Sequence, residues 1–230
     1  MDAVIFDWGG TLTPWHTIDN AELWRVVCEP HYPDDHHDRA AAAHQAEIAL
    51  WELARTEQRS ATIFGVLERA GIQPTDDLIA TYLREWEPHT FTDPDGIAVL
   101  RQLREQGIKI GVLSNTMWPR DWHEDVFRRD GVLDLIDGAV YSSEIDWTKP
   151  HPEAFRAAMA AVGVSDPQRC VFVGDRPFDD IYGARQVGMR TVLVPHSEIP
   201  EVQRGHTEAE ADAVIHRLGE LLAVVDGWRL

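Results

Sequence analysis

The sequence predicts an α/β fold in which a doubly wound parallel sheet carries an inserted domain of helices. Two observations support this. Short apolar runs alternate with helical patterns over residues 91–230, as in chains built from parallel βαβ units. The segment 14–90 instead shows helical patterns alone and interrupts that rhythm after the first strand. We therefore predict a core domain of residues 1–13 and 91–230 and a helical cap domain of residues 14–90.

The strands of the core are predicted from short runs that are rich in β-branched residues. Glycine or polar residues flank these runs, which is typical of buried strands bounded by turns. Because helical patterns separate the runs, the strands are expected to pair in parallel through right-handed crossovers. The predicted strands are residues 3–6, 108–113, 170–173, 191–194 and 213–215.

The helices of the core are predicted from apolar residues at helical spacing. The segments 94–106 and 152–162 end at a glycine, and a third segment, 180–186, is followed by Gly188. Glycine just beyond a helical pattern is a common helix stop because it tolerates the left-handed backbone conformation.

The cap is predicted to contain four helices packed against one another. Their patterns cover residues 19–28, 35–58, 60–70 and 75–87. Tryptophans stand at helical positions within three of these segments, and we expect them to form the core of the cap. They are Trp24, Trp51 and Trp86.

Composition excludes several classes of function. The net charge of −18 argues against nucleic-acid binding, which needs a surplus of basic side chains. No apolar run is long enough to span a membrane, and no signal segment opens the chain. The two cysteines, Cys28 and Cys170, suggest neither a metal site nor a disulfide framework. We expect a cytoplasmic protein that binds neither nucleic acid nor membrane.

Polar side chains gather in four loops that are expected to meet at one edge of the sheet. In doubly wound sheets the carboxyl ends of the strands form the ligand-binding crevice. Clustered carboxylates repel one another unless a cation lies among them, and Mg²⁺ prefers such oxygen ligands. One carboxylate could also attack phosphorus as a nucleophile, while a lysine and a hydroxyl hold the phosphoryl oxygens. The loops carry Asp7, Ser114–Asn115, Lys149, and Asp175 with Asp179–Asp180.

Four segments resemble, in order, the motifs of the haloacid dehalogenase (HAD) superfamily. The likeness covers nearly the whole chain and is to the subgroup with a helical cap after the first motif. It implies a HAD-like core with a C1-type cap. The segments are residues 7–11 (Asp-Trp-Gly-Gly-Thr), 113–116 (Leu-Ser-Asn-Thr), 148–155 (Thr-Lys-Pro-His-Pro-Glu-Ala-Phe) and 173–180 (Val-Gly-Asp-Arg-Pro-Phe-Asp-Asp).

The resemblance implies roles for the residues that would meet the substrate. Asp7 would be the nucleophile, and Lys149 would neutralise both the nucleophile and the phosphate. Ser114 would bind the transferring group with help from the backbone of Asn115. Arg176 is a candidate for substrate binding, although a plain surface position is an equal alternative.

The resemblance also implies a Mg²⁺ site. Asp7 would be one ligand, the backbone carbonyl at Gly9 a second, and Asp175 a third, directly or through water. Asp180 matches the spacing of the family's last acid better than Asp179, although the family tolerates both spacings.

Gly9 departs from the family pattern. Family phosphatases usually carry an aspartate there, which protonates the leaving group and later activates water. The leading interpretation is a Mg²⁺-dependent phosphatase of a small phosphorylated metabolite that acts through a phospho-aspartate at Asp7. Two alternatives stay open: hydrolysis of a carbon–halogen bond, and a catalytically impaired protein that binds a ligand or a protein partner. His16 is a candidate replacement for the missing acid or, alternatively, a hinge residue.

Overall fold

The centre of the molecule is a parallel β-sheet, as the sequence predicts. The structure, a computed structural model, describes residues 1–195 and 209–229. Within them the strand order is β3-β2-β1-β4-β5-β6, and every neighbouring pair is parallel. The strands are β1 (Ala3–Phe6), β2 (Lys109–Ser114), β3 (Gly138–Tyr141), β4 (Cys170–Gly174), β5 (Arg190–Leu193) and β6 (Ala213–Val214).

The chain reverses its direction across the sheet between β1 and β4. From β1 it proceeds to β2 and β3 on one side, and from β4 to β5 and β6 on the other. The backbone N–H of Asp7 still donates to the Val173 carbonyl at 2.9 Å, just beyond β1. Asp7 therefore lies at the topological switch point, where doubly wound sheets bind their ligands.

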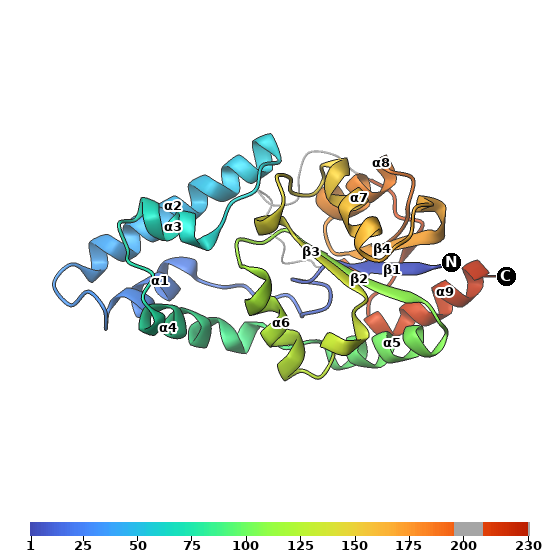
Figure 1. The fold of residues 1–230 in the computed structure, drawn as a ribbon, viewed down its shortest axis with the longest axis horizontal. Helices are drawn as coiled ribbons and strands as arrows, with labels where there is room; N and C mark the ends of the chain where they lie inside the picture. Colours follow the sequence, from blue (N-terminus) through green and yellow to red (C-terminus); the bar gives the residue numbers. More distant parts are fainter. Residues whose placement is uncertain (196–208, 230) are drawn as a thin grey trace.

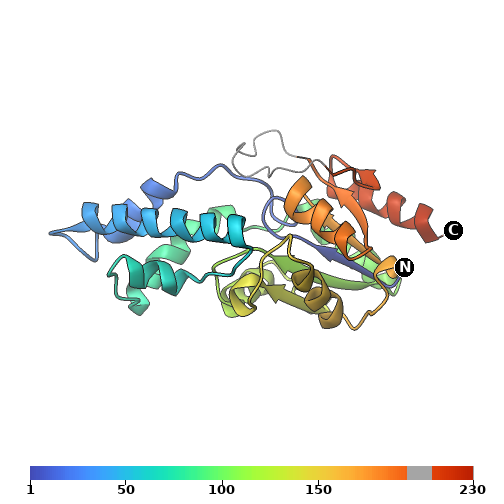
Figure 2. The same cartoon turned by 90° about the horizontal axis from the view of Figure 1, so that it is seen from above.

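Helices cover both faces of the sheet (Figures 1 and 2). On one face lie α7 (Pro152–Ala161) and α8 (Gly183–Gln186), and on the other α5 (Pro94–Glu105) and α9 (Leu221–Arg229). The alternation of side chains along β1 explains how one strand serves both layers. Its residues at positions 4 and 6 pack in the α5 and α9 layer, and those at positions 3 and 5 pack in the α7 layer.

The four predicted cap helices are present and lie beside the sheet rather than on it (Figure 1). Three begin where Asp19, Thr62 or Thr75 accepts a backbone N–H with its side chain, which stabilises a helix start. The helices are α1 (Asn20–Cys28), α2 (His36–Glu57), α3 (Ile63–Arg69) and α4 (Asp76–Trp86).

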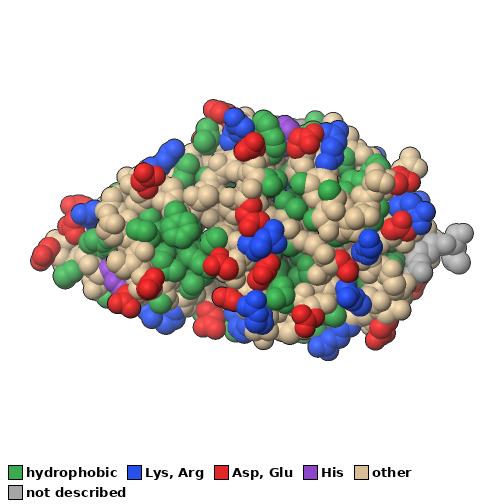
Figure 3. All heavy atoms as spheres, in the orientation of Figure 1, with side chains coloured by type: hydrophobic (Ala, Val, Ile, Leu, Met, Phe, Trp, Pro, Cys, Tyr) green, Lys and Arg blue, Asp and Glu red, His purple; other side chains and the backbone are tan. Residues whose placement is uncertain are grey.

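The tryptophans of the cap differ in burial. Trp24 is 1% exposed, and Trp86 is partly buried against the same apolar cluster. Trp51 is 38% exposed, so the prediction that it belongs to the cap core is wrong. On the face shown in Figure 3, apolar side chains gather over the cap, while acidic and basic side chains are interspersed.

Three elements were not predicted from the sequence. The edge strand β3 is short, and only Val140 and Tyr141 of it are buried. The helix α6 (Arg120–Arg129) begins without a side-chain cap, is rich in charged residues and buries only Trp122, His123 and Phe127. The terminal helix α9 was also missed. The predicted helix over 180–186 is instead a wide helical turn, Pro177–Tyr182, followed by α8.

The cap rests on α6 and on the loop before it. Met117, Trp118 and Trp122 pack within the same apolar cluster as α1 to α4. Two segments connect the cap to the core, one between β1 and α1 and the other between α4 and α5. The second is held in place, because the backbone and hydroxyl of Thr92 both donate to Asp130 at 2.8 Å.

None of the helices within residues 1–195 and 209–229 has the length and apolar character that a membrane span requires.

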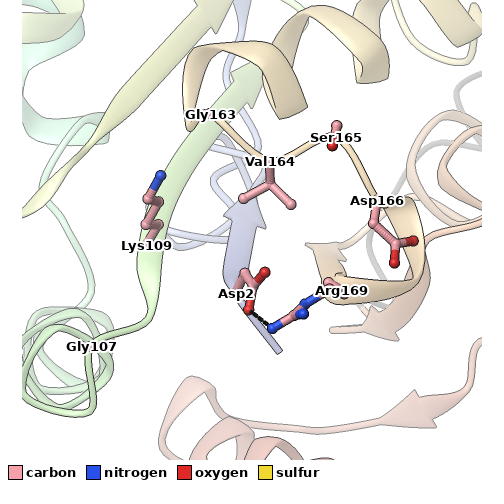
Figure 4. A pocket seen from close by; sticks show the side chains of 8 residues that line it. All are labelled: Asp2, Gly107, Lys109, Gly163, Val164, Ser165, Asp166 and Arg169. Atoms are coloured by element: carbon pink, nitrogen blue, oxygen red, sulfur yellow. Dashed lines mark hydrogen bonds and ion pairs between the residues drawn. The ribbon is translucent and has the colours of Figure 1, made fainter.

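A hollow of about 500 Å³ opens at the amino ends of the strands, opposite the loops that carry the candidate site residues (Figure 4). Its basic side chains are already engaged: Arg169 pairs with Asp2 at 2.5 Å, and Lys109 donates to the Val162 carbonyl at 2.8 Å. None of the residues expected to carry chemistry lines it.

Candidate active site

The predicted loops converge at the carboxyl edge of the sheet. Asp7 follows β1, Ser114 ends β2 and Asp175 follows β4, and all three are buried. Lys149 comes from the loop between β3 and α7. Because β1 pairs with both β2 and β4, Asp7 lies between the other two strand ends.

Lys149 joins two of the carboxylates. Its Nζ lies 2.7 Å from Asp7 Oδ1 and 2.6 Å from Asp180 Oδ1. The side chain is 3% exposed. Burial alone would lower the pKa of Lys149, but Asp180 and Asp7 outweigh it and hold that pKa above its ordinary value. The lysine is therefore charged and placed to neutralise the nucleophile candidate.

Asn115 fixes the backbone of the lysine loop. Its side-chain Nδ2 donates to the Lys149 carbonyl at 2.9 Å, and its Oδ1 accepts from the Lys149 N–H at 2.8 Å. This reciprocal pair ties the oxygen and one N–H of the Asn115 side chain to the backbone of Lys149. The pairing was not foreseen, because the two residues are far apart in the sequence.

Three carboxylates form a site that suits a cation. One oxygen each from Asp7, Asp175 and Asp180 lie within 4.8 Å of one another. Both oxygens of Asp175 are buried without a hydrogen-bond partner among the described residues, and the nearest cation, Arg176 Nε, is 3.9 Å away. Burial, together with Asp7 and Asp180, raises the pKa of Asp175 well above its usual range. This buried carboxylate, which accepts no hydrogen bond among the described residues, fits a ligand of Mg²⁺.

Asp180 differs from Asp175 in having partners for both oxygens. Its Oδ1 accepts from Lys149, and its Oδ2 accepts from the backbone N–H of Arg176 at 2.9 Å. Asp179 is not part of the carboxylate group among the described residues, and burial raises its pKa to about 7. Of the two adjacent aspartates, the geometry thus favours Asp180 for the site.

Gly10 allows the nucleophile loop to approach Asp175. Its φ of +86° is unfavourable for other residues, and a Cβ there would lie 2.6 Å from Asp175 Oδ2. Gly174 plays a similar part on β4, since a Cβ would overlap the Asp180 carboxylate. The carboxylates can gather only because these two positions lack a side chain.

Gly9 is exposed, and a Cβ built on it meets nothing within 4 Å. The position therefore has room for the side chain that the family usually carries. His16 is also exposed, and its ring centroid lies 5.2 Å from that of His89 on the other connecting segment. The Arg176 guanidinium carbon lies 5.2 Å from the centroid of the Trp15 ring.

A buried histidine that the sequence did not reveal supports the loop after β2. His123 Nε2 lies 3.0 Å from Thr116 Oγ1, directly beyond the Ser114–Asn115 pair. The ring stacks on Tyr141 at 4.4 Å and meets Trp8, the neighbour of Asp7, edge-on at 4.5 Å. Nothing in the polar sequence of α6 distinguishes this histidine from one on a solvated face.

We predict that His123 makes the fold sensitive to acid. Burial lowers the pKa of His123 from its ordinary 6.5 to about 3, so below pH 6.5 only the unfolded chain gains this proton. The free energy of unfolding should then fall by about 1.4 kcal/mol per pH unit as the pH drops, and the loss should end near the folded pKa. Urea unfolding from about pH 7 to about pH 5 measures this slope. His123→Gln, although less stable at neutral pH, should lose that part of the slope; equal slopes would contradict the assignment.

Comparisons with known proteins agree with this geometry. The model of the haloacid dehalogenase-like hydrolase family matches residues 1–188. The chain is 33% identical to a glyceraldehyde 3-phosphate phosphatase of Methanopyrus kandleri over 164 residues, which are 70% of this chain and 69% of that protein. Matches to three further relatives of that name span between 48% and 61% of their length.

Solved structures show the same fold over the whole chain. A HAD phosphatase from Thermococcus onnurineus has a TM-score of 0.72 at 24% identity and full coverage of both chains. An L-2-haloacid dehalogenase from Xanthobacter autotrophicus has a TM-score of 0.66 at 21% identity, with 99% of each chain covered. Together with the family match over most of the sequence, these findings show that the chain belongs to the haloacid dehalogenase-like hydrolases and is an enzyme of that class.

Proposed function

We propose that this hydrolase is a Mg²⁺-dependent phosphatase of a small phosphorylated metabolite and acts through a phospho-aspartate at Asp7. The observation that carries the proposal is the arrangement of Asp7, bound by Lys149, beside the buried carboxylate of Asp175, which accepts no hydrogen bond among the described residues. Phosphoryl transfer needs a charged group that neutralises the phosphoryl oxygens and free carboxylate oxygens that bind the metal cation. Lys149 and Asp175 offer these two features at one edge of the sheet. The names of the relatives support the same class of substrate.

Each residue of the site would have a distinct role in the reaction. Lys149 holds Oδ1 of Asp7, which leaves Oδ2 to attack phosphorus, while the bond from phosphorus to the leaving oxygen breaks. The leaving oxygen departs as an anion and takes its proton from solvent. Water then attacks phosphorus and gives up a proton to solvent, which releases phosphate and restores the carboxylate of Asp7. Asp7, Asp175 and the Gly9 carbonyl would hold Mg²⁺ with Asp180, and a bound Mg²⁺ would neutralise phosphoryl oxygens. Ser114, the Asn115 backbone and Arg176 would bind the phosphoryl group.

The two alternatives are less well supported. An impaired, binding-only protein has no need for the buried Asp7–Lys149–Asp180 contacts, which cost desolvation to maintain. For carbon–halogen cleavage, likeness to a dehalogenase at 21% identity supports the fold alone. We also propose that the cap domain extends from residue 14 to residue 90. A cytoplasmic location is proposed as well, because Cys28 and Cys170 are buried free thiols, as is usual in a reducing compartment.

We expect millimolar Mg²⁺ to raise the melting temperature and to be required for hydrolysis of acetyl phosphate and p-nitrophenyl phosphate. A ligand at a hundred times its Kd adds about 2.7 kcal/mol to the stability of the native state. For a chain of this size, that corresponds to a rise of about 5–10 °C. Differential scanning fluorimetry with and without Mg²⁺ measures the shift.

The matched control is a pair of aspartate variants. Asp175→Asn should lose the Mg²⁺ response, and Asp166→Asn, at the opposite end of the sheet, should retain it. A melting curve and an activity that both ignore Mg²⁺ would show that the metal assignment is wrong.

A further inference from the structure

A short segment of the cap pairs with the loop that carries Lys149. Arg59 and Trp147 form an antiparallel bridge between two otherwise separate parts of the chain. The backbone N–H of Thr148 donates to the Gln58 carbonyl at 3.0 Å, and that of Ser60 donates to the Asp146 carbonyl at 3.3 Å. In Figures 1 and 2 the end of α2 reaches the loop after β3 at this point.

Side chains reinforce the backbone pairing. The Arg59 guanidinium carbon lies 4.7 Å from the centroid of the Trp147 ring, and that ring stacks on His151 at 3.9 Å. The hydroxyl of Thr148 donates to the Ala54 carbonyl in the last turn of α2 at 3.4 Å. The contacts therefore flank the lysine on both sides, at positions 147–148 and 151.

The end of α2 adopts an unusual conformation to make this pairing. Gln58 has a φ of +54°, and among the described residues it is the only one besides glycine with a positive φ. Such a conformation is unfavourable for a residue with a side chain and persists where the surroundings hold it. It turns the chain out of α2 so that the next residues run antiparallel to the lysine loop.

We propose that cap residues 58–60 position Lys149, so that docking of the cap on the core and alignment of the lysine are a single event. The ammonium is held by Asp7 and Asp180, and the backbone of Lys149 by Asn115. The peptide just before it is held by the cap, through Thr148. The inference rests on the proposed function, because it assigns the pairing to the same reaction.

The geometry of the bridge offers a direct test. The hydrogen bonds run between the neighbours of Arg59 and Trp147, so these two residues form a non-hydrogen-bonded pair. In such pairs the Cα atoms are about 4.5 Å apart, which is within the range that a disulfide spans. The native Cys28 and Cys170 are buried and unpaired. A double variant, Arg59→Cys with Trp147→Cys, can therefore be opened by reduction and closed by oxidation.

In the reduced double variant we expect kcat for acetyl phosphate to fall by about 10- to 100-fold, with little change in KM, because the catalytic group is misplaced. Oxidation should restore most of the lost kcat. Wild-type kcat in the reduced form would overturn the proposal. Loss of activity on oxidation would also overturn it, since the pairing would then have to open during turnover.

Controls separate positioning from general damage. Each single cysteine variant should be insensitive to oxidation. Arg39→Ala removes another arginine–aromatic contact, 5.1 Å from the Tyr32 ring and wholly within the cap, and should leave kcat unchanged. A drop in kcat for Arg39→Ala equal to that of the reduced double variant would assign the effect to cap stability and overturn positioning.

An NMR measurement that does not depend on catalysis distinguishes this proposal from the proposed function. The chain has only two lysines, so ¹³C-labelled lysine gives two sets of NMR signals, which Lys109→Arg assigns. The Lys149 signals should shift in the reduced double variant and return on oxidation, while those of Lys109 stay fixed. If the wild type hydrolyses no phosphate ester but these shifts occur, the proposed function fails and the coupling stands. Unmoved Lys149 signals would refute the coupling itself.

Discussion

Asp7→Asn is expected to lower kcat for phosphate hydrolysis by ~10⁴-fold or more, since removal of a nucleophile leaves only binding and charge neutralisation. The amide has nearly the same shape as the carboxylate but cannot attack phosphorus. The fold should survive, because Lys149 keeps its second ion pair, with Asp180 at 2.6 Å. Kinetics with acetyl phosphate and the melting temperature measure the two effects separately.

A matched variant lies just before the same strand. Asp2→Asn changes the aspartate that precedes β1, where it pairs with Arg169 on the surface, and should leave kcat unchanged. Beryllium fluoride, which mimics a phosphoryl group on aspartate, should stabilise the wild type in the presence of Mg²⁺ but not Asp7→Asn. Activity of more than a few per cent in Asp7→Asn would assign the nucleophile to another residue.

The parts of the fold that the sequence predicted are those whose pattern is local. The central strands are continuous apolar runs because both faces of β1, β2 and β4 are covered by helices. Three of the four cap helices carry side-chain caps at their starts, which mark them in the sequence. The edge strand β3 is only half buried, and charged side chains dominate α6, so neither segment stands out as an apolar run.

The candidate site was likewise predicted only in part. The grouping of Asp7, Asp175 and Lys149 was predicted because the loops after parallel strands meet at one edge of a doubly wound sheet. Contacts between distant segments were not predictable, because no spacing rule relates their members. Asn115 on the lysine backbone and the Gln58 pairing with Thr148 are of this kind. So is the burial of His123, which depends on how α6 lies against the sheet.

Gly9→Asp is expected to raise kcat/KM for alkyl phosphates by ~10²-fold or more, since a general acid contributes ~10²–10⁴ in rate. An alkoxide leaving group needs a proton in the transition state, whereas an acyl or aryl leaving group is already a stable anion. Alkyl substrates should therefore gain most. The structure has room for the new side chain, because a Cβ on Gly9 meets nothing within 4 Å, although Trp8 is adjacent in the sequence and Trp15 follows at the end of the same loop.

The measurement is the slope of log kcat/KM against the pKa of the leaving group. The wild type should show the steeper fall as that pKa rises, and Gly9→Asp should flatten it. Gly9→Asn is the matched control, because it fills the same space without an ionisable proton and should keep the steep slope. If wild type and Gly9→Asp have equal slopes, another residue already supplies the proton. His16 would then be tested first, because it lies on the connecting segment just past the nucleophile loop and is exposed, with its ring beside His89. A His16→Gln variant that steepens the slope would identify it as that acid.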